Sequence, residues 1–399
     1  MDLTLTRITL ITETFAPEIN GVANTLGHLV RGMLAAGIEI QVIRPRQHKQ
    51  DKSHQKGRLT TTTLPGLPLP GYNALKFGLP MKRQILDAMA QFKPQAVYVA
   101  TEGPMGWAAV KAAQQLGLGV LSGFHTNFHQ YIEHYHLGML EKLAYRYLRY
   151  FHNQTQGTLV PTRKQRDELE QHGFDNVRVL SRGVDSELFS PTKRSDALRR
   201  QWGAKPQDLV LLYVGRIAGE KNMDLALKTY QQLLNTDERV RLVLVGDGPE
   251  LENIREQYPQ VICCGMQRGE DLAQHYASGD IFLFPSKTDT FGNVVTEAMA
   301  SGLAVVSFDY AAAHEHIRNN DNGMLADFDN DQSFIQQAAT LLDSPNLLNQ
   351  IRAHARNTAR NISWKTIVEE FIARLNSTQT EVNNHGTRKT NATKSSATV

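Results

Sequence analysis

Residues 281–308 read IFLFPSKTDTFGNVVTEAMASGLAVVSF. The apolar runs Ile281–Phe284 and Ala304–Phe308 have the length and composition of buried strands, and a helix is predicted to begin near Asn293, after a turn at Gly292. A strand, a helix and a second strand in this order form a βαβ unit, whose two strands lie parallel in one sheet. This stretch therefore predicts an α/β protein built on a parallel sheet.

The same alternation of short apolar runs and longer helical patterns extends in both directions along the chain. In the second half, further strands are predicted at Leu209–Val214, Leu242–Val245 and Val261–Cys264. An earlier series of strands is predicted at Ile8–Thr12, Ile38–Arg44, Ala96–Ala100, Val120–Phe124, Thr158–Val160 and Val177–Leu180. Between the two series, residues 189–208 contain two prolines and several charges but no strong hydrophobic period. The chain is therefore predicted to form two successive doubly wound α/β domains.

The boundaries of these parts follow from the pattern. An N-terminal domain is predicted over residues 1–190, a hinge linker over residues 191–208 and a second domain over residues 209–360. A final helix is predicted over residues 361–376. Residues 377–399 are rich in Thr, Asn, Ser and Lys with almost nothing apolar, so we expect a disordered tail.

Composition and charge are those of an ordinary globular chain. Its 399 residues are 41% hydrophobic and 21% charged, and the net charge is +3. Residues 1–190 hold 21 Lys and Arg against 15 Asp and Glu, and residues 191–399 hold 22 against 25. This mild asymmetry lacks the dense basic patches of nucleic-acid binders. It fits an anionic membrane surface or, equally, unevenly distributed solvated charges.

Features that bear on location point to the reduced interior of a cell. No stretch approaches the ~20 apolar residues that span a bilayer, and no secretion signal is recognised at the N-terminus. The two cysteines, Cys263 and Cys264, are adjacent, and neighbouring cysteines are poorly placed to bond each other. We therefore expect a cytoplasmic protein. A periplasmic sugar-binding protein of similar outline is disfavoured, because it would need an export signal.

The first candidate functional residues lie within residues 281–308. Asp289 lies on the predicted loop, and Glu297 lies in the first turns of the predicted helix. The free backbone N–H groups at a helix N-terminus attract phosphate, and carboxylates accept hydrogen bonds from sugar hydroxyls. The spacing also fits an Asp in a capping region followed by a solvated Glu on the helix, so both interpretations stay open at this point.

A second charged cluster follows the predicted strand Leu209–Val214 and contains Arg216 and Lys221. In open α/β sheets, ligands bind beyond the carboxyl ends of strands. Two cations at that place would bind an anionic ligand such as a phosphate. The alternative is an Arg and a Lys on an exposed loop. Further on, Val245-Gly-Asp-Gly-Pro249 predicts a tight strand-to-helix turn with Asp247 as a helix cap.

Together these segments resemble family 4 of the retaining glycosyltransferases with the GT-B fold. Asp289 and Glu297 match the two acidic positions of its acidic-x7-acidic signature, and Glu-Ala-Met-Ala-Ser-Gly follows in register. Gly215-Arg216 and Glu220-Lys221-Asn222 match a second family pattern, and residues 245–249 match a third. Most members have Glu where this chain has Asp289. Within the family, the sequence looks most like bacterial GDP-mannose-dependent α-mannosyltransferases and glycosyl-diacylglycerol synthases.

The resemblance implies two Rossmann-like, doubly wound domains that face a central cleft, with the final helix returning to the first domain. It implies that the second domain holds a nucleotide-sugar donor and that the first holds an acceptor. The residues implied at the donor are Asp289, Phe291, Gly292 and Asn293 at the transferred sugar, Glu297 at the ribose, and Arg216 and Lys221 at the diphosphate. By the same resemblance no metal or other cofactor is needed, because the two cations replace it.

In the first domain the resemblance points to two residues. Gly21 lies in a loop that resembles the family's Pro-x-x-x-Gly segment beside the donor phosphates. His125 follows the predicted strand Val120–Phe124 and coincides with the family histidine that lies near the sugar. His314-Glu-His316 lacks the His-Glu-x-x-His spacing of a helical zinc site, so no metal is expected there.

The predicted helix Leu140–Asn153 has two contrasting faces. Its apolar face carries Leu140, Leu143, Ala144, Tyr147, Leu148 and Phe151, and its basic face carries Lys142, Arg146 and Arg149. Core packing beneath a solvated basic face explains this pattern. Contact with an anionic membrane explains it too, since several members of the family meet lipid acceptors through basic and aromatic surfaces.

With the resemblance, these features predict a retaining hexosyltransferase that is peripheral on the inner face of the membrane and has no nucleic-acid partner. It would move a hexose from GDP-mannose or UDP-glucose to an acceptor hydroxyl on a membrane lipid such as diacylglycerol. The alternatives are a transferase with a soluble glycan acceptor and a nucleotide-sugar epimerase or phosphorylase of the same fold.

Overall fold

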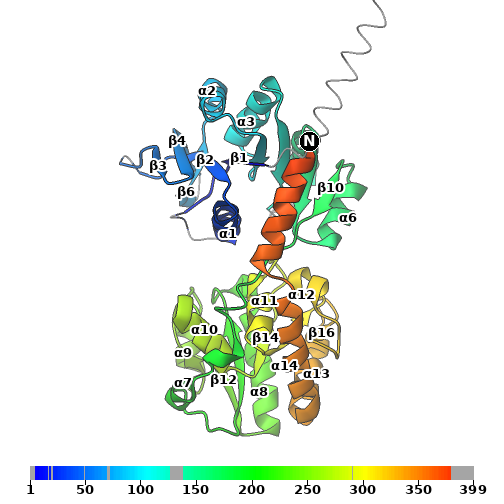
Figure 1. Ribbon diagram of the computed structural model, residues 1–399. Coiled ribbons are helices and arrows are strands. Elements are labelled where there is room, and N and C mark those ends of the chain that lie inside the picture. The colour runs from blue at the N-terminus through cyan, green and yellow to red at the C-terminus, as the bar shows by residue number, and fades with distance from the viewer. Residues whose placement is uncertain are drawn as a thin grey trace, which may run out of the picture. The chain divides into compact units, whose positions relative to one another are not determined.

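The structure is a computed structural model that describes residues 5–16, 18, 21–48, 50–69, 72–125, 138–289 and 291–378. These residues divide into two compact units, each with its own parallel sheet and helices (Figure 1). Unit 1 comprises the described residues up to Ser181 together with the helix over residues 364–378, and unit 2 comprises Arg182–Ser363. Residues 379–399, most of the expected tail, lie outside the described part of the chain.

The main sheet of unit 1 has eight strands in the order β10-β9-β8-β7-β1-β2-β4-β3. The strands are β1 (Arg7–Ile11), β2 (Glu39–Pro45), β3 (His54–Lys56), β4 (Leu59–Leu64), β7 (Ala96–Val99), β8 (Gly119–Gly123), β9 (Gly157–Val160) and β10 (Val177–Val179). All neighbours run parallel except β3 and β4. A separate antiparallel pair consists of β5 (Gly66–Leu69) and β6 (Tyr72–Gly78). A parallel sheet of this kind needs apolar cover on both faces.

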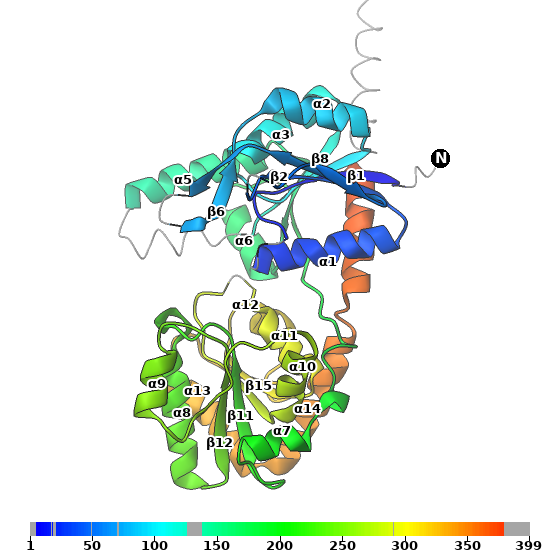
Figure 2. The same ribbon diagram turned by 90° about the vertical axis from the view of Figure 1, so that its left-hand side faces the viewer.

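Helices supply that cover in unit 1 (Figure 2). One face packs against α1 (Gly21–Ala35) and against the helix over residues 364–378, which adds Ile367, Val368, Phe371 and Leu375 to the core. The other face packs against α2 (Lys82–Phe92) and α3 (Pro104–Gln115). Helices α5 (Gly138–His152) and α6 (Arg163–Gln171) pack beside β9 and β10. The final helix of the described chain therefore completes the core of unit 1.

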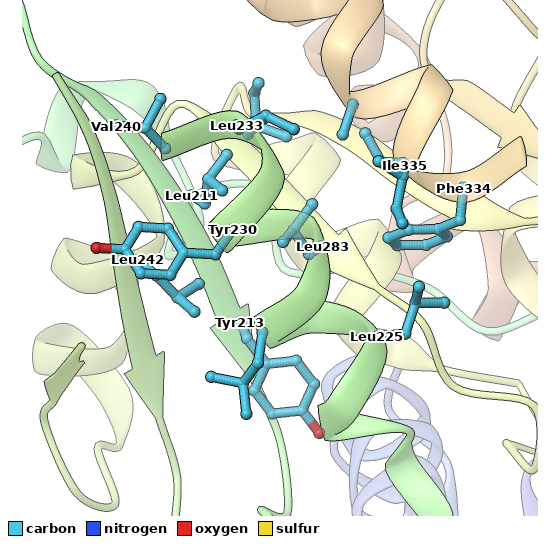
Figure 3. Close-up of a cluster of buried hydrophobic side chains, with 14 of the residues drawn as sticks. Leu211, Tyr213, Leu225, Tyr230, Leu233, Val240, Leu242, Leu283, Phe334 and Ile335 are labelled. Atoms are coloured by element: carbon cyan, nitrogen blue, oxygen red, sulfur yellow. The ribbon is translucent and has the colours of Figure 1, made fainter. Parts of the chain in front are cut away.

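The sheet of unit 2 has six strands, all parallel, in the order β13-β12-β11-β14-β15-β16. They are β11 (Leu209–Val214), β12 (Val240–Val245), β13 (Ile262–Cys263), β14 (Ile281–Phe284), β15 (Ala304–Phe308) and β16 (Met324–Ala326). The helices are α7 (Asp196–Gln201), α8 (Met223–Thr236), α9 (Leu251–Gln257), α10 (Gly269–Ser278), α11 (Asn293–Ala300), α12 (Ala311–His316), α13 (Asp331–Asp343) and α14 (Pro345–Arg360), with 3-10 turns η1 (Pro191–Lys193) and η2 (Gly219–Lys221). Side chains of α8 and α13 pack onto the central strands (Figure 3).

Each main sheet has one point where the winding of the chain reverses. In unit 1, β2 and β4 lie on one side of β1, whereas β7 to β10 lie on the other. In unit 2, β12 and β13 lie on one side of β11, whereas β14 to β16 lie on the other. Ligands of open α/β sheets bind at the carboxyl ends of the two strands that flank such a switch point. The fold thus places the candidate sites after β1 and β7 in unit 1 and after β11 and β14 in unit 2.

Residues 191–208 differ from the hinge linker that the sequence predicted. They contain η1 and α7, and they belong to unit 2, which begins at Arg182. Two of the charges in this segment are paired within unit 2, because Arg194 Nη2 and Arg199 Nη1 each lie 3.0 Å from the buried carboxylate of Asp280. Since Asp280 lies far along the chain from both arginines, the local pattern of the segment carried no sign of this cluster.

Candidate functional site

The loops after β11 and β14 bring a lysine and an aspartate together at the switch point of unit 2. Lys221 is the last residue of η2, and its Nζ is 3.0 Å from Asp289 Oδ2. Only 20% and 22% of their side-chain surfaces are exposed. Asn222 connects the same two loops, because its Nδ2 donates a hydrogen bond of 3.3 Å to the carbonyl of Pro285. Residues that are far apart in the sequence therefore share one charged site.

Arg216, the other predicted cation, follows the end of β11. Its Nη1 is 2.9 Å from Glu220 Oε1, and both side chains are exposed. Its backbone carbonyl accepts a hydrogen bond of 2.8 Å from the hydroxyl of the buried Tyr213. The main chain at Arg216 is thus held in place, whereas the guanidinium is held by a surface ion pair, which contributes little to stability.

The turn into α11 brings backbone groups to the same switch point. Gly292 has a φ of +82°, a left-handed conformation that glycine adopts without strain. Phe291 is buried, and its carbonyl accepts a hydrogen bond of 2.7 Å from the backbone N–H of Ala312. Asn293 begins α11, and its buried Oδ1 accepts no hydrogen bond from the residues that the structure describes. The first N–H groups of a helix also lack partners within the helix, so this start can pair with a bound anion.

Glu297 lies against Tyr276 of α10. One of the two interpretations of the sequence had placed Glu297 in solvent. The Tyr276 hydroxyl donates a hydrogen bond of 2.9 Å to Glu297 Oε2. Burial raises the pKa of Glu297 to about 7, although the hydrogen bond from Tyr276 acts in the opposite direction. Glu297 is therefore a half-buried, hydrogen-bonded carboxylate and not a fully solvated one. A ligand hydroxyl that donated to this carboxylate would favour its charged form.

A hollow of about 600 Å³ lies beside Arg216 at the carboxyl ends of β11 and β12. It is lined by residues 214–216, residues 245–249, Met266, Gln267 and Leu272. Gly246 is required there by close packing, because a Cβ on it would lie 1.8 Å from the carbonyl oxygen of Gly215.

The capping role predicted for Asp247 is wrong. Its Oδ1 accepts a hydrogen bond of 2.8 Å from the backbone N–H of Gly248, which tightens the turn. The N-cap residue of α9 is instead Glu250. The turn is longer than the local pattern indicated, so the carboxylate of Asp247 stays at the wall of the hollow.

The candidate residues of unit 1 lie just after its strands. Two of them were predicted from the sequence, and two others were not. His125 follows β8, and its Nε2 is 2.8 Å from the hydroxyl of Tyr98 on β7. Gly21 is the first residue of α1. The roles predicted for His125 and Gly21 toward the donor stay predictions. Two glutamates, Glu13 after β1 and Glu102 after β7, were missed, because nothing local to either one marks them as neighbours.

Within the described ranges, no helix is both long enough and apolar enough to cross a bilayer. The part of the chain that the structure describes also contains no group of three His, Cys, Asp or Glu side chains placed to hold a metal ion. Cys263 and Cys264 are not joined in a disulfide, and burial raises the pKa of each thiol. Both thiols are therefore protonated at neutral pH.

Two doubly wound sheets, with a charged loop cluster at the switch point of the second, fit the GT-B class of glycosyltransferases. Residues 19–188 match the family model described as Glycosyltransferase Family 4, and residues 194–358 match the model described as Glycosyl transferases group 1. The chain therefore belongs to the family 4 glycosyltransferases, as its motifs predicted.

Individual relatives are similar to this chain over most of its length. It is 30% identical to a GDP-mannose-dependent alpha-mannosyltransferase of Mycolicibacterium smegmatis, with 92% of this chain and 96% of the relative covered. It is 26% identical to an alpha-monoglucosyldiacylglycerol synthase of Streptococcus pneumoniae, with 75% of this chain and 70% of the relative covered. Its fold is similar to that of Anabaena HepE in complex with UDP and glucose, with a TM-score of 0.70, 17% identity, and 93% and 100% of the two chains covered. The predicted GT-B fold is confirmed.

Proposed function

We propose that this glycosyltransferase is a retaining hexosyltransferase that uses a nucleotide-diphosphate sugar and a hydroxyl of a membrane lipid. The observation that carries the proposal is the Lys221–Asp289 pair, which lies at the switch point of unit 2 together with the start of α11. A cation, a carboxylate and free helix N–H groups in one place suit a ligand that has both phosphates and sugar hydroxyls. The names of the relatives support a nucleotide-sugar donor and a lipid acceptor.

The proposed donor contacts follow the loops of unit 2. Lys221 and Arg216 bind the diphosphate, and these cations take the place of a metal ion. Asp289 and the backbone over residues 291–293 hold the transferred sugar. Glu297 accepts hydrogen bonds from the ribose, which favours the charged form of its carboxyl group.

The proposed transfer breaks the bond between the anomeric carbon and the diphosphate oxygen and forms a bond from the acceptor oxygen to the same carbon. Attack on the face that the diphosphate leaves retains the configuration. The leaving diphosphate oxygen takes the proton of the acceptor hydroxyl. Negative charge grows on the diphosphate as its bond breaks, and one preorganised donor aimed at such charge is worth about 3–4 kcal/mol in the transition state.

GDP-mannose is the donor that we propose, because the relative at 30% identity carries this donor in its name. A ligand at 100 times its dissociation constant stabilises the folded state by about 2.7 kcal/mol, which raises the melting temperature of a domain of this size by roughly 5–10 °C. We expect GDP and GDP-mannose to cause this rise in a thermal-shift assay. UDP and UDP-glucose should cause a much smaller one.

Each other outcome of this assay has a definite meaning. A rise with the uridine ligands alone would make UDP-glucose the donor, and equal rises would show that the base is not selected. If none of the four ligands changed the melting temperature, the proposed function would be contradicted. Product analysis with the donor alone separates the alternative enzymes, because an epimerase changes the sugar whereas a transferase at most hydrolyses the donor slowly.

Helix α5 presents the surface that we propose for membrane contact. Leu143, Tyr147 and Tyr150 are 62%, 44% and 56% exposed. The core packing predicted for this helix is confirmed for Leu148 and Phe151, which are buried, but it is wrong for Leu143 and Tyr147. A helical period shows which residues share a face, but the width of the face that neighbouring elements cover depends on the tertiary structure. Exposed apolar groups gathered in this way mark interaction surfaces.

Exposed cations lie on the same helix. Lys142, Arg146 and Arg149 are exposed, and the side chain of Leu140 lies outside the described residues. A hollow of about 750 Å³ is lined by Leu143, Arg146, Tyr147, Arg149, Tyr150 and Asn153. Aromatic and aliphatic side chains beside Lys and Arg are typical of helices that lie in the interface of an anionic membrane. We therefore propose peripheral membrane contact through α5.

Replacing Lys142, Arg146 and Arg149 together by Ser should weaken binding to anionic vesicles at least about tenfold, because each cation near such a surface contributes about 1 kcal/mol. Co-sedimentation with phosphatidylglycerol vesicles measures the effect. The matched control replaces three cations of α6 by Ser, namely Arg163, Lys164 and Arg166, and should bind like the unchanged protein. Unchanged binding of the α5 variant would remove the membrane proposal.

A further inference from the structure

Two carboxyl groups that the donor site does not use meet at the switch point of unit 1. Glu13 follows β1 and Glu102 follows β7, and these strands are parallel neighbours. The two loops are joined, because the backbone N–H of Glu13 donates a hydrogen bond of 2.9 Å to Thr101 Oγ1. Glu13 and Glu102 therefore leave the sheet where an open α/β fold binds its ligand.

Both carboxyl groups are withdrawn from water. Glu102 is only 7% exposed. Glu13 is partly buried, and its inaccessible Oε1 accepts no hydrogen bond from the described part of the chain. The same carboxyl group lies against the main chain at Gly103, where a Cβ would be 2.1 Å from Glu13 Oε1. The backbone N–H groups of Gly78 and Met105 hydrogen-bond this carboxyl group, but its buried Oε1 has no donor among the described residues, which costs stability. A ligand hydroxyl that donated to Oε1 would offset this cost.

The groups that face Glu13 come from several elements. They are the carboxyl group of Glu102, the phenol of Tyr147 on α5, and the backbone N–H groups of Gly78 in β6 and Met105 in α3. Burial, and then the charge of Glu102, raise the pKa of Glu13 to about 7, while the two backbone N–H groups act in the opposite direction. A carboxyl group in this state can accept or donate a hydrogen bond near neutral pH, as groups in binding sites commonly do.

Tyr147 links this pair to the surface that we propose for membrane contact. Its hydroxyl donates a hydrogen bond of 2.6 Å to the backbone carbonyl of Glu102. Its ring is part of the exposed apolar face of α5. A lipid held at α5 would therefore have its polar head close to Glu102.

We infer that Glu13 and Glu102 form the acceptor site and together bind two adjacent hydroxyls of the acceptor's head group. This inference rests on the proposed function and narrows it. A carboxylate accepts hydrogen bonds from hydroxyls, and a protonated carboxyl group can donate one. Two adjacent hydroxyls, as on a sugar or polyol head group, pair with both side chains. The single hydroxyl of diacylglycerol leaves one of them unpaired, and a site built for a hydroxyl disfavours a ligand that lacks it.

The test compares the acceptor kinetics of Glu13→Gln and Glu102→Gln with those of the unchanged protein. The probes are vesicles with monoglucosyldioleoylglycerol, which has adjacent hydroxyls, and vesicles with dioleoylglycerol, which has one. The unchanged protein should prefer the first by about tenfold or more in kcat/KM, and each variant should raise the KM for it about tenfold or more. The matched control is Glu39→Gln, at the exposed amino end of β2, which should keep the normal KM.

Measurements on the donor side keep the two proposals apart. The thermal shift caused by GDP and the slow hydrolysis of the donor without acceptor should be normal in both variants. If the unchanged protein transfers sugar and neither variant changes the acceptor KM, the inference fails while the proposed function stands. If the unchanged protein neither binds a nucleotide nor transfers sugar, the proposed function fails first.

A stability measurement excludes a merely structural role. Because folding raises the pKa of Glu13 from 4.5 to about 7, its contribution to the free energy of unfolding is fully present below about pH 4.5 and is lost as the pH rises to about 7. Glu13→Gln removes this loss, so at pH 8 the variant should melt at or above the temperature of the unchanged protein. A lower melting temperature at pH 8 would show that Glu13 serves the fold and would overturn the inference.

Discussion

Replacing Lys221 by Ala should lower turnover by about 100-fold or more, while the protein stays folded and still binds nucleotide. Lys221 Nζ lies 3.0 Å from Asp289 Oδ2, so the cation is held in place before a donor arrives. A preorganised group of this kind is worth about 3–4 kcal/mol in the transition state, and about 1.4 kcal/mol corresponds to a factor of ten in rate. Because it acts mainly on the leaving diphosphate, kcat should fall more than KM rises. Initial rates of sugar transfer at saturating donor measure the effect.

The loop that carries Asp289 offers a matched control for this variant. Lys287 pairs with Asp329, and Lys287→Ala should keep a rate close to normal. Arg216→Ala should lose turnover to a similar extent as Lys221→Ala. Asp289→Asn should harm sugar transfer more than nucleotide binding. Normal rates in all three variants of the proposed site would show that the site assignment is wrong.

Replacing Asp280 by Ala should lower the free energy of unfolding of unit 2 by about 3–5 kcal/mol. Asp280 is 5% exposed and accepts hydrogen bonds of 3.0 Å from Arg194 and Arg199 and of 2.9 Å from the backbone N–H of Val210. Arg199 is itself buried, so removing the carboxylate leaves an uncompensated charge in the interior. Unfolding in guanidinium chloride, followed by circular dichroism, measures the loss.

Two further variants make this result interpretable. Asp280→Asn keeps the side-chain volume and an acceptor oxygen but removes the charge, so it should remain folded and lose less stability than Asp280→Ala. Asp237→Ala is the matched control in the same unit, because its partner Arg239 is exposed and the loss of the carboxylate leaves no buried charge. If Asp280→Ala destabilised unit 2 no more than Asp237→Ala, the cluster around Asp280 would not hold residues 191–208 in place.

The local pattern of apolar residues was sufficient to predict the secondary structure of residues 281–308. Strands β14 and β15 have the predicted bounds, and α11 begins at the predicted Asn293. The physical causes act within a few residues, since they are an apolar run of strand length, a left-handed turn at Gly292 and a helical period. Repetition of such βαβ units then leaves few topologies other than a parallel, doubly wound sheet.

Only part of the candidate site could be predicted from the sequence. The motifs singled out Arg216, Lys221 and Asp289, whose roles stay predictions, but their spacing could not show that Lys221 contacts Asp289. For the same reason, the sequence did not predict that Glu13 and Glu102 are neighbours. These two become neighbours only when β1 pairs with β7, and no feature near either residue reports that pairing.

The sequence by itself determined the parallel α/β architecture and the family motifs, because these depend on short-range periodicity and on residue identity. Only the tertiary structure decided the raised pKa of Glu297, the ion pairs that hold residues 191–208, and the exposure of Leu143 on α5. A pKa depends on how far burial removes a carboxyl group from water, and an ion pair depends on the distance between atoms that folding brings together. Neither quantity has a local signature along the chain.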